Sequence, residues 1–135
     1  MDKNFKEMAA NLTIEIQETY ESGVTMESAE KLAAKFLHAQ IVISDELSVV
    51  DIDARMKRAG TKALKASVYL AEVEKVDKKP SDTMLEALVL RTREVQEQVT
   101  AEIHAEVDKD QLINYFQIFK EAHIYFRGIA KGRFE

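Results

Sequence analysis

The chain contains no cysteine, one proline and four glycines among 135 residues. Without cysteine it has no disulfide framework and no thiolate metal site, which fits a reducing cytoplasm. Glycine and proline, which break helices, are rare, and the sequence shows little of the apolar–polar alternation that is typical of strands. Both features favour long helices over sheets. The longest purely apolar runs, such as Ala87–Leu90, last about one helical turn. The N-terminal segment also lacks the apolar core of a signal peptide. These absences predict an all-α cytoplasmic protein with no membrane span.

The residues that are present are typical of a folded chain. Apolar residues make up 46% and charged residues 32% of the sequence, which favours a globular protein over a disordered one. The length predicts a single domain, residues 1–135, built from elongated antiparallel helices. The net charge of -5 argues against a general nucleic-acid coating protein, but it permits a locally basic site.

Hydrophobic periodicity predicts three to four helices, one of them very long. Residues 1–22 form an amphipathic helix that ends near Gly23. Residues 25–77 form one helix of roughly 75 Å with Thr25 as its N-cap; the alternative is a break within residues 44–48. Residues 82–130 hold the C-terminal helices. After a turn at residues 77–82, a helix runs to about Val107, and Asp108 or Asp110 caps the last one, unless the two run together.

Two heptad seams follow each other along the long helix, and both indicate packing against another helix. The first seam comprises Ala29, Ala33, Phe36, Gln40, Ile43, Leu47 and Val50. The second seam comprises Ile52, Met56, Ala59, Ala63, Ala66, Leu70 and Val73. Because the second seam is rich in alanine, we expect its partner helix to approach closely.

A basic stripe lies about a quarter-turn from the second seam. Residues 54–71 hold five cations and no acid, although the chain is acidic. On a helix with about 100° of rotation per residue, four of these cations and a tyrosine fall within an arc of roughly 80° and so form one stripe along the helix. This basic stripe consists of Arg55, Arg58, Lys62, Lys65 and Tyr69. Cations that end in an aromatic ring suit a phosphate backbone with stackable bases, and the alternatives are a solvated face or pairing with acids on a packed helix.

The last segment carries a broad aromatic stripe. We expect the chain to form a homo-oligomer, because long helices leave their seams exposed. The predicted contact consists of Leu112, Tyr115, Phe116, Phe119 and Phe126. The alternative is that these residues close a core within one chain, and the sequence favours neither.

The sequence offers no catalytic constellation. Each of the three histidines follows a lysine or an alanine at the spacing where a di-iron bundle needs glutamate. There is also no activated nucleophile. We therefore expect neither an enzyme nor a metal or other cofactor. Gly128 and Gly132 indicate the end of the last helix.

Several motifs together resemble the UvsY family, the recombination mediators of T-even bacteriophages. The motifs are Phe36-Leu37, then Ala63-Leu64-Lys65-Ala66 with Tyr69 beyond, and the aromatic C-terminal segment. The resemblance covers most of the chain from about Ala33. Two features depart from the family pattern: Ser67 replaces an arginine, and a glycine-rich turn after the tyrosine is missing.

The resemblance implies a helical protein that forms rings through its C-terminal helices and binds single-stranded DNA. Such proteins help to load a RecA-like recombinase onto strands covered by single-stranded-DNA-binding protein, without a nucleotide of their own. In this chain Lys65 matches the lysine of the family motif, and Arg55, Arg58 and Lys62 would supply the missing charge. The resemblance thus implies a cytoplasmic recombination mediator, which would act in the cytoplasm of the host cell if the protein is encoded by a phage. The alternative is a helical adaptor or phage assembly factor whose basic stripe meets an acidic protein.

Overall fold

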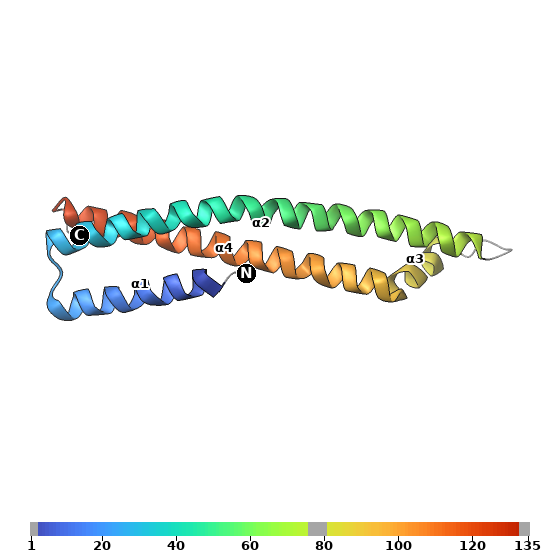
Figure 1. Cartoon of the computed structure of the whole chain (residues 1–135), viewed down its shortest axis with the longest axis horizontal. Coiled ribbons are helices and arrows are strands. Elements are labelled where there is room, and N and C mark those ends of the chain that lie inside the picture. The colour runs from blue at the N-terminus through green and yellow to red at the C-terminus, as the bar shows by residue number, and fades with distance from the viewer. Residues whose placement is uncertain (1–2, 76–80, 133–135) are drawn as a thin grey trace. The chain divides into compact units, whose positions relative to one another are not determined.

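The computed structural model describes residues 3–75 and 81–132, and within these ranges it contains four helices and no strand (Figure 1). The helices are α1 (Lys3–Ser22), α2 (Met26–Glu74), α3 (Asp82–Arg91) and α4 (Arg93–Ala130). The prediction of an all-α fold with one very long helix is confirmed. α2 runs for 49 residues without the break considered at residues 44–48. Residues 76–80 of the predicted turn lie outside the described residues.

Contacts divide the chain into two units. The first unit consists of Met1–Ser48 and Asp110–Glu135, and the second unit is Val49–Lys109. In the first unit, Nδ1 of His123 donates to the carbonyl oxygen of Ala33 at 2.8 Å. In the second, the amide of Gln98 reaches the carbonyl oxygen of Lys57. Within each unit, α2 and α4 therefore lie side by side.

The sequence signals around Gly23 end one helix and begin the next. Gly23 has a φ of +89°, the left-handed conformation typical of the residue after a helix, and its N–H donates to the carbonyl oxygen of Tyr20. Thr25 and Ser28 then form a reciprocal capping box in which each hydroxyl accepts from the other residue's backbone N–H. The predicted end of α1 and the predicted N-cap of α2 are both confirmed.

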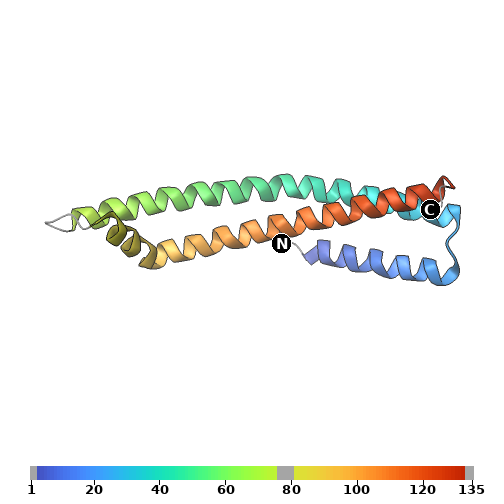
Figure 2. The ribbon, with the colours of Figure 1, turned by 180° about the vertical axis from the view of Figure 1, so that it is seen from behind.

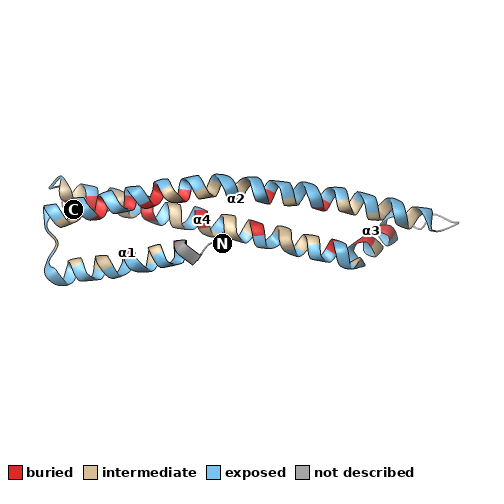
Figure 3. Cartoon of the chain, viewed as in Figure 1, coloured by how far each residue is buried: buried red, intermediate tan, exposed pale blue. Residues whose placement is uncertain are grey.

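An aromatic cluster forms the core of the first unit. Phe36 lies with its ring centre 5.6 Å from that of Phe119 and 5.9 Å from that of Phe126. α1 adds the buried Phe5 and Leu12, and both α1 and the end of α4 lie along the first half of α2 (Figure 2). Five of the seven residues of the first seam are buried, which confirms that it packs (Figure 3).

The same cluster decides between the two interpretations of the C-terminal aromatic stripe. Leu112, Phe119 and Phe126 are buried within the chain, and Tyr115 and Phe116 are half-buried. The first three thus leave almost no surface for an oligomeric contact, because Phe36 already covers two of the rings. The structure supports the intrachain core for these three residues.

Of the two alternatives for residues 108–110, a cap at Asp108 or Asp110 is wrong and a continuous helix is confirmed. The break falls at Thr92, which has extended backbone angles and accepts at its carbonyl oxygen from the N–H of Gln96. α4 then continues through residues 108–110. No glycine or proline marks Thr92, whereas aspartates are also common on exposed helix surfaces, so the stronger sequence signal pointed to the wrong place. Ser81 caps α3, because its hydroxyl accepts from the N–H of Met84.

The second seam does not pack on any of the chain's described helices, so the chain itself does not supply the partner helix that the pattern predicts. Ile52 is 59% exposed, Met56 69% and Leu70 62%. α4 instead packs against the opposite side of α2, where Ala54 and Thr61 are buried. The hydrogen bond from Gln98 and the ion pairs described below hold that side of α2 against α4.

None of the described helices combines the length and the apolar character that crossing a membrane requires.

The aromatic core predicts a stability difference between two neighbouring residues of α2. Phe36→Ala removes a buried ring and should lower the free energy of unfolding by about 3–5 kcal/mol. Leu37→Ala, at a side chain that is 45% exposed, should cost about 0.5 kcal/mol or less. Urea denaturation followed by circular dichroism measures both values. Equal losses in the two variants would contradict the assigned core.

Candidate nucleic-acid interface

The basic stripe lies on α2 between the side that packs on α4 and the exposed second seam. Ala54 and Thr61 mark the packed side, and the stripe begins beside them. Arg55, Arg58 and Lys62 are exposed, whereas Lys65 and Tyr69 are half-buried. The structure therefore keeps the predicted residues together on one helix within the second unit.

Acids of the same unit already contact the two arginines. Nε of Arg55 lies 3.1 Å from the Asp51 carboxylate one turn earlier. Arg58 reaches across to α4, where its guanidinium pairs with Glu106. Both arginine side chains are more than half exposed, and exposed ion pairs contribute about 0–1 kcal/mol. A bound phosphate could therefore replace either carboxylate at small cost.

Lys62 and Lys65 form the unpaired centre of the stripe. Neither ammonium group makes an ion pair with any residue in the part of the chain that the structure describes. Lys57, one turn before Lys62 but off the line, pairs instead with Asp53 at 2.9 Å. Lys62 and Lys65 are thus the cations most available to an external anion.

Tyr69 lies at the end of the stripe in a shallow groove. The groove has a volume of about 560 Å³ and is lined by Lys65, Ala66, Tyr69, Glu86, Val89 and Leu90. The Tyr69 hydroxyl donates to the Asp82 carboxylate at 3.2 Å, which restrains the ring. The carboxylate of Glu86 disfavours phosphate in the groove itself, whereas a stacked base is compatible with its apolar wall.

Asp51 is a centre of charge that the sequence prediction missed. Lys109 of α4 lies 2.8 Å from its Oδ1, and Arg55 lies on its other oxygen. The hydrogen bond from Lys109 is the main cause that lowers the pKa of the Asp51 carboxyl below its ordinary value; burial opposes this shift and Arg55 adds to it. Asp51 thus ties one end of the stripe to α4.

Negative charge is concentrated away from this unit. Residues 49–109 hold eleven lysines and arginines against twelve aspartates and glutamates, a net charge of -1. The other residues carry the remaining -4 of the chain's net -5. The basic stripe therefore lies in the less acidic part of the chain, where repulsion of a polyanion is weaker.

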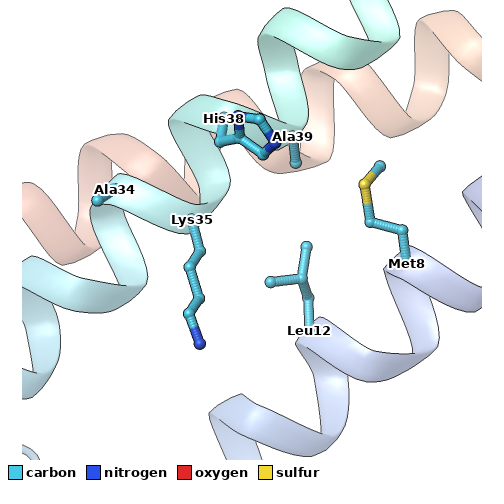
Figure 4. Close-up of a pocket in the computed structure, with 6 residues that line it drawn as sticks. All are labelled: Met8, Leu12, Ala34, Lys35, His38 and Ala39. Atoms are coloured by element: carbon cyan, nitrogen blue, oxygen red, sulfur yellow. The ribbon is translucent and has the colours of Figure 1, made fainter.

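A second hollow lies between α1 and α2 in the first unit (Figure 4). Its volume is about 350 Å³, and Met8 and Leu12 of α1 point across it toward Lys35, His38 and Ala39 of α2. The Lys35 ammonium pairs with Glu15 of α1. The walls are mainly apolar apart from Lys35 and the exposed His38.

The histidines do not converge on a metal site. His38 and His104 are exposed, and His123 is committed to the Ala33 carbonyl. Among the described residues, no group of three histidine, aspartate or glutamate side chains could hold a metal ion.

The two acids that pair with the arginines of the basic stripe differ in whether the sequence alone predicts the pairing. Asp51 precedes Arg55 by one helical turn, so the one-turn spacing of opposite charges predicts that pair. Glu106 is separated from Arg58 by 48 residues. Its role depends on the alignment of α4 with α2, which periodicity alone does not determine.

Comparison with known protein families, curated proteins and solved structures gave no match to this chain.

The ion pairs of Asp51 predict a stability that depends on pH. Because its folded pKa is lowered, the pairs stabilise the fold above the unfolded value of about 3.9, and this contribution is lost as the pH falls through the folded value. Asp51→Asn should therefore lower the urea midpoint at pH 7, and the difference from wild type should close as the pH falls from the unfolded value into strong acid. The matched control is Asp53→Asn, which breaks only a pair within α2 and should shift the midpoint less. A difference that persists unchanged into strong acid would contradict this role.

Proposed function

We propose that the protein binds single-stranded nucleic acid through the basic stripe of α2. The observation that carries the proposal is the pair Lys62 and Lys65 at the centre of a line of like charge, where neither forms an ion pair with any residue that the structure describes. Like charges one turn apart repel each other and destabilise a helix. A bound polyanion removes this cost, and the half-buried Tyr69 at the end of the line supplies a surface on which a base can stack.

We further propose that this binding serves DNA recombination, repair or replication. The support is the resemblance to phage recombination mediators, whose motif lysine corresponds to Lys65. In this role the protein would act without catalysis or a cofactor. It would help a RecA-like recombinase to displace single-stranded-DNA-binding protein, and several copies on one strand would add avidity to modest single sites.

The second candidate function is that of a helical adaptor for an acidic protein partner. The observation that favours it is the set of carboxylates already on the stripe, because Asp51 and Glu106 show that an acidic side chain fits Arg55 and Arg58. An adaptor of this kind would bind a partner through carboxylates and would not respond to nucleic acid.

The salt dependence of binding tests the first proposal. Fluorescence anisotropy with labelled single-stranded DNA should give a log–log slope near roughly -3 for four engaged cations, at about -0.7 per neutralised phosphate. The double variant Lys62→Ala/Lys65→Ala should bind more weakly and reduce the slope to about -1.4.

Lys57→Ala is the matched control, because Lys57 lies on the same helix, off the stripe, and is paired with Asp53. It should keep most of the affinity. Binding that cannot be detected at low salt, or an equal loss in the control, would exclude the stripe as the DNA site. Undetectable binding to DNA together with binding to an acidic protein would favour the adaptor.

Removal of a competing carboxylate should strengthen binding. Glu106→Gln releases the Arg58 guanidinium for phosphate, and we expect on the order of twofold to fivefold tighter binding from the loss of one exposed pair. Glu97→Gln removes the same charge from α4 but frees Arg93, which is not part of the stripe. If the two variants tighten binding equally, net charge rather than Arg58 is responsible.

A further inference from the structure

An unpartnered apolar seam runs along α2 in the second unit. It consists of the second seam together with Val49, one heptad step before Ile52. Val49 is 61% exposed, and similar values hold for Ile52, Met56 and Leu70. A heptad pattern sustained over more than three repeats is typical of a coiled-coil contact. Because α4 packs on the opposite side of α2, this contact is left unmade within the chain.

We propose that the seam is an interface with a second copy of this chain, which packs against it in the antiparallel direction. This inference rests on the apolar seam and not on nucleic-acid binding. It also places the interface on α2, away from the C-terminal aromatic residues that are buried in the first unit.

The order of residues along the seam makes it complementary to itself. Consider two antiparallel copies aligned so that the numbers of any two facing residues add up to 122. Each residue of the seam then faces another residue of the seam. Ile52 then lies opposite Leu70 of the second copy, and Met56 lies opposite Ala66. The centre brings Ala59 against Ala63 in both directions. Small residues in the middle let the helices approach closely, and large residues close both ends.

The charges beside the seam are compatible with this arrangement. On one edge Asp53 lies near Ser67 of the second copy, and Gly60 lies near its own counterpart. Glu46 and Glu74, at the two ends of this edge, are the acids that face each other. On the other edge Arg55 lies near Tyr69 of the second copy, a pairing suited to a cation–π contact. On this second edge Lys62 meets its own counterpart, and its long exposed side chain can extend into solvent.

The size of the seam fits a weak but specific dimer. From Val49 to Val73 the helix is about 36 Å long at 1.5 Å per residue, and a strip about 10 Å wide gives a projected area of roughly 400 Å² per copy. Side-chain relief makes the accessible surface larger than this projection. The pair therefore reaches the order of 1,000 Å² that separates specific contacts from incidental ones. A twofold contact of this kind is also the commonest form of homo-oligomer.

Mass measurement across a concentration series tests the proposal. Sedimentation equilibrium of the full chain should show a reversible shift from 15.4 kDa toward twice that mass as concentration rises. Met56→Glu and Leu70→Glu place charge on the seam at exposed positions and should each weaken the dimer at least tenfold. Ile103→Glu, on α4 and 56% exposed, is the matched control and should leave it unchanged. Helical content by circular dichroism verifies that each variant folds.

Engineered cysteines test the direction of pairing against a background free of native thiols. A mixture of Ala59→Cys and Ala63→Cys chains should form a mixed disulfide on oxidation. Either variant alone should link slowly, because the offset of four residues adds about 6 Å along the axis and exceeds disulfide reach. Efficient linking of Ala59→Cys to itself would indicate parallel helices and overturn the proposal. A chain that stays monomeric at high concentration, or a dimer that tolerates both seam variants, would overturn it as well.

Discussion

The choice of which side of α2 packs on α4 determines the other functional features of the second unit. Polar contacts add to burial on that side: Lys109 pairs with Asp51, Glu106 pairs with Arg58, and Gln98 donates to the Lys57 carbonyl. Ala54 and Thr61 of α2 are buried there, and the other buried side chains among this unit's described residues are Leu85, Val89, Val95 and Ala105 of α3 and α4. Polar contacts are directional, so they add specificity to this packing although each exposed ion pair contributes little free energy. This packing leaves the basic stripe at the edge and the apolar seam facing solvent.

Much of the fold was accessible from the sequence, because its signals are local. Gly23 and the pair Thr25 and Ser28 define the junction between α1 and α2 through short-range backbone chemistry. The first seam predicts its own burial, since Phe36 and its neighbours are large and apolar. The junction at Thr92 was not predictable in the same way, because no glycine, proline or strong cap marks it. The exposure of the second seam was not predictable either. A heptad pattern indicates that a helix face packs against another helix, but it does not indicate whether that helix belongs to the same chain.

The candidate site shows the same division between local and distant information. Helical spacing alone places Arg55, Arg58, Lys62, Lys65 and Tyr69 on one line, and the structure keeps them there. Spacing does not reveal that Glu106 neutralises Arg58 from another helix or that Lys109 shares Asp51 with Arg55. Among the residues that the structure describes, these contacts leave Lys62 and Lys65 as the stripe's cations without an ion pair. The electrostatic strength of the site therefore depends on α4, a helix that contributes no residue to the stripe.

The division into two units also has a consequence for the order of folding. The second unit is one continuous stretch, and its contacts join residues 13 to 58 positions apart. The first unit joins the two ends of the chain, with Ala33 meeting His123 across 90 positions and Tyr20 meeting Tyr125 across 105. Closing a long loop costs more entropy than closing a short one. Once the second unit has formed, however, the chain between Ser48 and Asp110 is already shortened, and the effective loop for the aromatic core is small. The unit with the weaker core is thus expected to nucleate the unit with the stronger one.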